Sequence, residues 1–451
     1  MREASPRNER TADGDPAALP LPPGPDGWPV VGNAVHVVRD PFGFYDALAE
    51  YGDVVRYRLG RSRFVTVLRP DLVEQVLLED FRTYDKWTNV DFAPEGLVFT
   101  DGQQWRRQRT VVQEAFTVDR VRSYGDAMAR FADERVDDWA DGERVALNEA
   151  FSNLTLRVLA HTLLDVDLAS GGGLVAEFAD VITERANLRS LSAFLPSWVP
   201  TPANRRFERT RSAFREYVDA TITDREHEGR EDLLSLFLHA TGEEGGGLRE
   251  EEVRDQVITF LFAGHETTSL ALTYAVLLLA RHPEQRQRLD EEYDDVMAGA
   301  RPTVADVADL TVTERVIREA LRLYPPVPVL SREAAEDAVL DGYRVPEGTR
   351  LIAPQFYLHT DERWWSDPES FRPDRWTEER EAERPDYAYF PFGGGPRHCI
   401  GMRFAMLEMQ LVLATMLQRV EFELLSDPDP DLHAGGLLRP QSDVEVRVRK
   451  R

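Results

Sequence analysis

A glycine-rich segment near the C-terminus holds the only cysteine of this 451-residue chain. The segment, called the cysteine loop below, covers residues 389–403 and reads YFPFGGGPRHCIGMR. Its three consecutive glycines permit a tight bend or a close approach to a flat ligand, because they lack a Cβ. Apolar residues then recur at helical spacing over 404–416, so Cys399 is predicted just before a helix, whose free N–H groups favour a thiolate. One thiol cannot form an intrachain disulfide, and this setting suits a metal ligand.

The spacing Phe392-x-x-Gly395-x-Arg397-x-Cys399-x-Gly401 resembles the haem-ligand loop of the cytochrome P450 family. In that family the cysteine thiolate is the proximal ligand of the haem iron and pushes electron density toward O–O cleavage. The resemblance implies that Cys399 binds the iron of one b-type haem. It also implies that four other residues of the loop contact the haem: Phe392, Arg397, His398 and Gly401. A buried structural cysteine is the alternative, and the motifs below weigh against it.

The composition indicates a large globular protein without polyanionic partners. Hydrophobic residues make up 42% of the chain, enough to bury a sizeable core. The net charge of −26 and the pI near 4.8 argue against nucleic acid or an anionic membrane as a general partner. No apolar run at the N-terminus is long enough for a signal peptide or a membrane anchor. Since a single cysteine gives no sign of an oxidising compartment, we expect a cytoplasmic protein.

The acidic excess also points to a habitat. Lysine occurs only at Lys86 and Lys450, whereas acidic residues number 80. Concentrated salt would screen the self-repulsion of such a surface, so we predict a salt-loving source. A genome rich in G and C is the alternative, and it explains the preference for arginine but not the acidic residues.

No Ser/Gly-rich linker and no internal repeat divides the chain. Residues 1–18 are polar and charged, and we predict a disordered tail. The resemblance implies that residues 19–451 form a single haem domain, mainly α with small β-sheets. Local patterns predict a helix over 44–51, strands over 54–59 and 64–68, a hairpin around Asp341-Gly342 and an edge strand over 444–448.

Trp105 and Arg109 are four residues apart in a helical pattern, so they lie on one face. The resemblance implies that both bond a haem propionate, and that Arg332, Arg397 and His398 reach a propionate as well. A solvated basic face on an amphipathic helix is the alternative for the first pair.

A long helical run over 253–280 is apolar nearly all round toward its C-terminal end, so it must be buried. Its charged residues leave no uncharged stretch of about 20 residues, which excludes a membrane span. The run contains Ala263-Gly264-His265-Glu266-Thr267-Thr268, and a carboxylate in a buried helix needs a purpose or a partner. This segment matches the central-helix motif of the family. The resemblance implies that Ala263 and Gly264 lie over the haem face, with Gly264 making room, and that Glu266 and Thr267 deliver protons to dioxygen.

Glu319 and Arg322 are three residues apart on a helix that a Thr311-x-x-Glu314 capping box is predicted to start. They match the Glu-x-x-Arg pair of the family, and Arg375 matches its third member. The resemblance implies a buried clamp that holds the cysteine loop. An exposed ion pair, worth at most about 1 kcal/mol, is the alternative.

Together the motifs imply a haem-thiolate monooxygenase that inserts one oxygen atom of O2 into a C–H bond. The motifs indicate no flavin or iron–sulfur domain, so we expect a separate ferredoxin- or flavodoxin-like protein to supply electrons. The segment Thr259-Phe260-Leu261-Phe262 resembles soluble bacterial fatty-acid hydroxylases of the family, which favours a small apolar substrate, lipid- or terpenoid-like. Two rivals remain, a P450-type peroxygenase and a haem-binding sensor or electron carrier without turnover.

Two surfaces follow from the same resemblance. Five arginines are predicted to form a positive docking patch for the electron donor: Arg106, Arg107, Arg120, Arg122 and Arg403. Four apolar residues are possible walls of the substrate pocket: Phe178, Ile182, Phe194 and Leu195.

Overall fold

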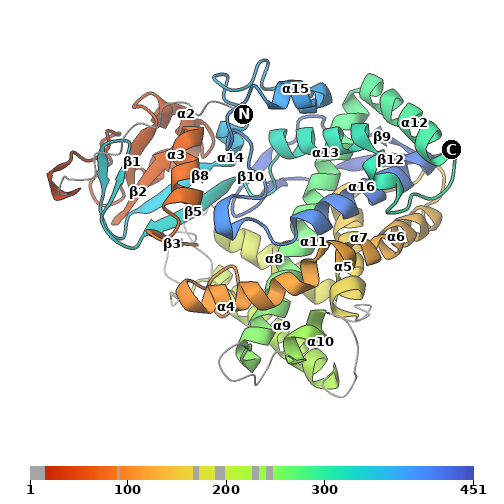
Figure 1. The fold of residues 1–451 in the computed structure, drawn as a ribbon, viewed down its shortest axis with the longest axis horizontal. Coiled ribbons are helices and arrows are strands. Elements are labelled where there is room, and N and C mark those ends of the chain that lie inside the picture. The colour runs from red at the N-terminus through yellow and green to blue at the C-terminus, as the bar shows by residue number, and fades with distance from the viewer. Residues whose placement is uncertain (1–15, 89–91, 166–171, 188–198, 226–232, 240–246) are drawn as a thin grey trace, which may run out of the picture.

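The structure is a computed structural model that describes residues 16–88, 92–165, 172–187, 199–225, 233–239 and 247–451. Helices dominate it, as predicted (Figure 1). Their bounds are α1 Ala34–Arg39, α2 Gly43–Ala49, α3 Pro70–Glu74, α4 Gly102–Gln113, α5 Val118–Ser123, α6 Gly125–Asp138, α7 Leu147–Leu159, α8 Gly172–Ala186, α9 Pro202–Arg225, α10 Leu233–His239, α11 Glu250–Arg281, α12 Pro283–Met297, α13 Thr311–Leu323, α14 Gln355–Leu358, α15 Glu378–Glu381 and α16 Met402–Arg419.

The strands form small sheets, also as predicted. Their bounds are β1 Val54–Leu59, β2 Ser62–Val67, β3 Tyr84–Lys86, β4 Arg144–Ala146, β5 Val329–Ala334, β6 Ala338–Leu340, β7 Tyr343–Val345, β8 Arg350–Pro354, β9 Val420–Leu424, β10 Leu432–Ala434, β11 Leu438–Pro440 and β12 Glu445–Lys450. Within the described residues the largest sheet has the order β1-β2-β8-β5-β3, and it lies to one side of the helical body (Figure 1). The smaller sheets are β10-β11, β4-β12-β9 and β6-β7.

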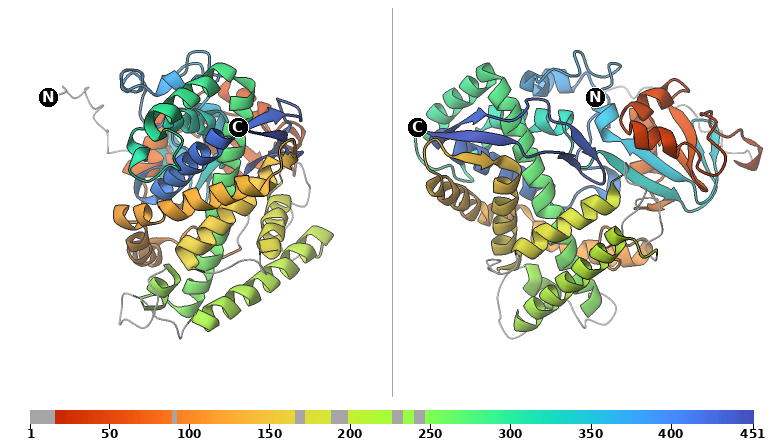
Figure 2. Two further views of the ribbon diagram at one scale, coloured as in Figure 1. Left: turned by 90° about the vertical axis from the view of Figure 1, so that its right-hand side faces the viewer. Right: turned by 180° about the vertical axis from the view of Figure 1, so that it is seen from behind.

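Helix α11 crosses the middle of the molecule in all views (Figures 1 and 2). It spans 32 residues and packs against α7, α13 and α16, so most of its side chains are buried. The helix begins where the Glu252 carboxylate accepts the backbone N–H of Arg249 at 2.8 Å, and Pro283 opens the next helix just after its end. The predicted central helix over 253–280 is therefore confirmed.

The predicted β region agrees closely with the structure. Helix α2 and strands β1 and β2 lie within two residues of the predicted bounds. Asp341 and Gly342 both have positive φ and join β6 to β7, which confirms the hairpin. The strand predicted over 444–448 exists as β12, but its predicted position at the edge of a sheet is wrong. It is a central strand, because it pairs with β4 on one side and β9 on the other. Its partner β4 has only three residues and lies about 300 positions earlier, so no local pattern revealed it.

The predicted capping box at Thr311 is also wrong. Leu310 is the N-cap residue of α13, and Thr311 is already the first helical residue. Glu292 of the preceding helix α12 instead accepts the backbone N–H groups of Val312 and Thr313, the latter at 3.0 Å. A carboxylate distant in sequence thus satisfies the free N–H groups that a local cap would have taken.

The N-terminal tail is only partly described. Residues 1–15 of the predicted disordered tail lie outside the described residues, whereas Pro16–Ala18 form a 3₁₀ turn. None of the helices that the structure describes is long and apolar enough to cross a bilayer.

Candidate functional site

A cavity of about 650 Å³ lies between helix α11 and the cysteine loop. Aromatic and aliphatic side chains form most of its wall. These include Phe92, Leu97, Phe99, Phe116, Leu159, Ile182, Phe260, Phe262, Val327 and Leu437. Of the predicted pocket residues, Ile182 lines the cavity, Phe178 packs behind Phe92 with ring centroids 5.6 Å apart, and Phe194 and Leu195 lie outside the described residues.

The side chain of Cys399 opens into this cavity, although protein surrounds it. Its backbone N–H donates to the Phe392 carbonyl oxygen at 2.8 Å, and helix α16 begins three residues later, as predicted. Burial raises the pKa of the Cys399 thiol, while the backbone N–H of Gly401 and the charge of Arg109 lower it. Burial is the largest of these effects on the Cys399 pKa. The stabilisation of a thiolate that we expected from the helix N-terminus therefore does not decide the charge of Cys399. A bound metal ion would remove the proton from such a thiol.

Packing against the rest of the protein requires a glycine at position 395 of the cysteine loop, whether or not a ligand is bound. Gly395 has a φ of +64°, and a Cβ there would lie 1.9 Å from the Leu77 carbonyl oxygen. This contact fixes the bend that precedes Cys399.

Basic side chains gather at one end of the cavity, on α4 and the cysteine loop. The Arg397 guanidinium lies over the Trp105 ring, 4.5 Å from its centroid, and donates to the Thr100 carbonyl oxygen at 3.0 Å. Arg109 donates to the His398 carbonyl oxygen at 3.0 Å, and its second terminal nitrogen lies 3.3 Å from the His398 ring. The structure therefore brings together four residues that the sequence predicted as propionate ligands.

Arg332 of β5 and Lys86 of β3 complete this basic end. Burial, Arg332 and Arg397 together lower the pKa of Lys86 to about 7. Burial and Arg397 likewise lower the pKa of Arg332 to about 10. No carboxylate lines this cavity in the part of the chain that the structure describes, although Asp101 pairs with Arg397 behind the wall. A cavity end with several cations and no carboxylate in its lining suits a ligand with more than one negative charge.

Helix α11 forms the wall that carries Ala263, Gly264 and Thr267. The Thr267 hydroxyl donates to the Ala263 carbonyl oxygen at 2.8 Å, so its lone pairs remain free to accept a hydrogen bond from a donor in the cavity. A Cβ at Gly264 would lie 2.9 Å from Leu159 Cδ1. Close contact with α7 is therefore one reason for a glycine at position 264. The sequence did not reveal this reason. Whether Gly264 also makes room over a haem stays a prediction.

Glu266 lies on the same helix but does not line the cavity. Its buried carboxylate has the partner that the sequence required, because Arg439 Nη2 forms an ion pair with Oε1 at 2.7 Å. The His265 ring lies on the other side, with Nε2 3.5 Å from Oε2.

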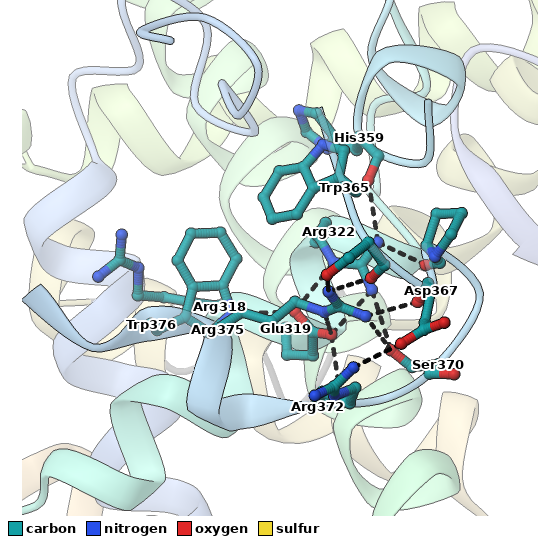
Figure 3. Close-up of polar contacts among 12 residues, drawn as sticks. Arg318, Glu319, Arg322, His359, Trp365, Asp367, Ser370, Arg372, Arg375 and Trp376 are labelled. Carbon is teal, nitrogen blue, oxygen red and sulfur yellow. Dashed lines mark hydrogen bonds and ion pairs between the residues drawn. The ribbon is translucent and has the colours of Figure 1, made fainter. Parts of the chain in front are cut away.

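The predicted clamp is buried, and Figure 3 shows the polar contacts among its residues. Arg322 donates twice to the Glu319 carboxylate, at 2.9 and 2.8 Å, and Arg375 Nε donates at 3.1 Å. Arg322 also donates to the His359 carbonyl oxygen at 2.9 Å, and His359 Nε2 accepts the backbone N–H of Phe390 at 3.0 Å. Burial and Arg322 lower the pKa of His359 to about 3, so this nitrogen stays an acceptor. The clamp thus holds the first residues of the cysteine loop.

Comparison with known families now identifies the chain. The cytochrome P450 family model matches residues 22–448. The chain belongs to the cytochrome P450 family. Its P450 relatives include cyclooctatin synthase of Streptomyces melanosporofaciens, 36% identical over 88% of each chain. Pentalenene oxygenase of Streptomyces avermitilis is 35% identical over 94% of this chain and 96% of its own. Cyclooctat-9-en-7-ol 5-monooxygenase of S. melanosporofaciens is 35% identical over 88% of each chain.

Membership makes this P450 a haem monooxygenase, and the residues present fit that cofactor. The cavity offers a single thiol for the iron and a basic end for the two carboxylates of the porphyrin. Sequence reasoning missed two residues of the site. The rarity of lysine in this chain was the one sequence feature that could have indicated Lys86. No sequence feature indicated Arg439, which lies far from Glu266 in sequence.

Proposed function

We propose that this P450 inserts one oxygen atom of O2 into a C–H bond of a small apolar substrate, lipid- or terpenoid-like. The reaction consumes two electrons and two protons, and it yields the alcohol and one water molecule. The observation that carries the proposal is the cavity, in which an apolar wall and Thr267 of α11 lie across from the Cys399 thiol. The bound haem supplies the activation of dioxygen.

Eleven residues hold the haem in this proposal. Cys399 is the iron ligand. Arg109, Arg332 and Arg397 neutralise the propionates, and Lys86 joins them because it lines the same basic end. The Trp105 and His398 rings would hold the propionates through hydrogen bonds from their ring N–H groups. Phe392 and Gly401 of the cysteine loop would contact the haem ring, as would Ala263 and Gly264 of α11, since all four line the cavity.

Glu266 and Thr267 supply protons in this proposal. An apolar cavity holds few water molecules, so protons must arrive through fixed groups. The Thr267 hydroxyl donates to the Ala263 carbonyl oxygen and lines the cavity, so its Oγ1 would accept a hydrogen bond from a donor in the cavity. Glu266 lies one residue away outside the cavity, where its carboxylate takes up a proton and passes it inward.

The names of the relatives support an apolar substrate. Pentalenene is an olefin, and cyclooctat-9-en-7-ol is an olefinic alcohol. Aromatic rings such as Phe92, Phe99 and Phe262 form an edge-to-face cluster in the cavity wall, which suits a rigid hydrocarbon better than a charged head group. The basic end of the cavity is already assigned to the propionates.

We also propose that a ferredoxin- or flavodoxin-like protein delivers electrons at the face that carries α4 and the start of α16. Arg106, Arg122 and Arg403 are exposed, whereas Arg120 is half-buried. Arg107 must be removed from the predicted docking patch, because it pairs with the buried carboxylate of Glu252. An acidic donor would be attracted to the exposed arginines of this otherwise acidic protein. The cytoplasm is the proposed compartment, since the single thiol must stay reduced.

Labelling with ¹⁸O₂ tests the function. The haem-loaded protein, a surrogate ferredoxin with its reductase, and a panel of terpene hydrocarbons that includes pentalenene would be incubated under ¹⁸O₂. We expect a hydroxylated product that carries one ¹⁸O atom, and we expect none from Cys399→Ser.

Other outcomes would identify the two rivals. Product formed from hydrogen peroxide without the donor, and none with O2, would indicate a peroxygenase. Absence of product from the whole panel of hydrocarbons and fatty acids, despite normal reduction of the haem, would support a sensor or electron carrier.

A further inference from the structure

The Glu266 carboxylate is enclosed by two side chains with different chemistry. Its side chain is only 9% exposed, and Arg439 Nη2 forms an ion pair with one carboxylate oxygen at 2.7 Å. His265 Nε2 lies 3.5 Å from the other oxygen, while His265 Nδ1 contacts the Leu261 carbonyl oxygen. A nitrogen that contacts a carbonyl oxygen carries the proton, so Nε2 is the bare nitrogen of the neutral ring.

Arg439 connects this buried carboxylate to the surface. It lies on β11, whose neighbour Leu438 accepts a hydrogen bond from the hydroxyl of Tyr274 on α11 at 2.9 Å. Its Nη1 donates at 3.2 Å to Asp180 of α8, whose side chain is 64% exposed. The strand is therefore fixed to the central helix, and the guanidinium bridges an inner and an outer carboxylate.

A surface crevice of about 420 Å³ opens at the same place. Its lining includes Asp180, Thr183, His433 and Arg439. Thr183 also lines the main cavity, so only a thin wall of α8 and the β10-β11 hairpin separates the crevice from the site. Solvent in the crevice comes close to Glu266 without passing through the substrate space.

We propose that Arg439 is a positioning residue that holds the Glu266 carboxylate ready to accept a proton, and that this crevice is where solvent protons reach the relay. The inference rests on the proposed role of Glu266. Arg439 holds the carboxylate but does not carry the proton, because a guanidinium stays protonated in proteins. Water in the crevice is the proton donor.

The two neighbours of Glu266 accommodate its two charge states. Arg439 stabilises the carboxylate, which would otherwise be costly in a buried site. Burial lowers the pKa of His265, so its ring stays neutral and its bare Nε2 can accept a hydrogen bond from the protonated acid. Glu266 can therefore take up a proton and release it while Arg439 stays next to one carboxylate oxygen and His265 next to the other.

Infrared difference spectra between the protein and its Glu266→Gln variant isolate the Glu266 band and need no turnover. At neutral pH we expect a carboxylate band in the parent, a shift of most of its intensity to the carboxylic acid band in Arg439→Gln, and recovery of the carboxylate in Arg439→Lys. Arg447→Gln is the matched control, because Arg447 pairs with Glu423 at the surface, and it should leave the band unchanged. A protonated Glu266 in the parent, or an unchanged band in Arg439→Gln, would overturn the proposal.

A second measurement tests the proton path and needs no substrate. The haem-loaded protein with a surrogate donor reduces O2 either to hydrogen peroxide, which takes two protons, or to water, which takes four. A weaker proton supply should raise the peroxide share in Arg439→Gln and in Asp180→Asn, a mild change at the crevice. If Glu266→Gln raises this share and neither of these variants does, the present inference is wrong and the proposed relay stands. If Glu266→Gln also leaves it unchanged, the relay itself is wrong.

Discussion

Lys86 shows how one side chain can link haem binding to pH. It is one of two lysines in the chain, and it lines the basic end of the cavity with Arg332 and Arg397. Burial and these two arginines lower its pKa to about 7 in the haem-free protein. Propionate carboxylates beside it would favour the charged ammonium and raise that pKa again.

The sign of the resulting pH effect follows from linkage. Below about pH 7 Lys86 is protonated with or without haem, so it adds no pH dependence. Above this pH, haem binding must take up a proton, so haem affinity should fall as the pH rises. Lys86→Gln should remove this slope and weaken binding by about 1.5–3 kcal/mol, the usual worth of a hydrogen bond to a charged group. Haem transfer to an acceptor protein, measured across this pH range, checks both effects.

Lys450 provides the matched control for that experiment. It is the other lysine, and it is exposed at the end of β12. Lys450→Gln should leave haem transfer and its pH dependence unchanged. Equal behaviour of the two variants would show that Lys86 does not contact a propionate.

These single residues mark the limit of prediction from the sequence. Cys399 and Thr267 were predictable because their neighbours form fixed local spacings. Lys86 and Arg439 were not, because strands β3 and β11 bring them to the site from distant parts of the chain. The charge patch was partly wrong for a similar reason, since nothing near Arg107 in sequence indicates that Glu252 takes its charge.

The elements α13 and the 3₁₀ turn Pro373–Trp376 meet through the clamp (Figure 3). Glu319 is fully buried and accepts hydrogen bonds from Arg322, Arg375 and the Trp376 ring nitrogen, the last at 3.0 Å. Removal of its charge leaves two arginines buried without their anion, which costs about 3–5 kcal/mol. We expect Glu319→Gln to lower the free energy of unfolding by that amount in urea titrations.

An exposed ion pair on another helix is the control for the clamp. Glu134 of α6 pairs with Arg130 at 3.2 Å, and both side chains are exposed. Glu134→Gln should cost less than about 1 kcal/mol. A similar small loss in Glu319→Gln would mean that the clamp contributes no more than a surface pair.

The elements themselves were predicted better than their pairings. Apolar periodicity placed α11 and the β1–β2 region within a few residues, because those signals are local. The central position of β12 and the carboxylate that caps α13 depend on contacts between distant segments, so no local pattern contains them.

The molecule as a whole carries 80 acidic and 54 basic residues. Many arginines form exposed ion pairs, such as Arg144 with Glu445 and Arg206 with Glu184. Salt weakens such pairs, but each contributes at most about 1 kcal/mol. The remaining net charge of −26 repels itself in the folded state, and the unfolded chain relieves part of that repulsion by expanding. Two opposing effects of salt therefore compete in this protein.

We expect the relief of repulsion to dominate, because the negative charges of the chain exceed the positive ones by 26, whereas the exposed pairs are individually weak. Screening shortens from about 10 Å at 0.1 M to about 3 Å at 1 M, so most of the gain should appear between those concentrations. The melting temperature should then rise with KCl. Sucrose at equal osmolality is the control, because it does not screen charge. It should reproduce only the part of the rise that comes from exclusion of the solute from the protein surface. A melting temperature that falls or stays level in molar KCl would mean that the ion pairs outweigh the repulsion. The acidic composition would then give no support to a habitat of high salt.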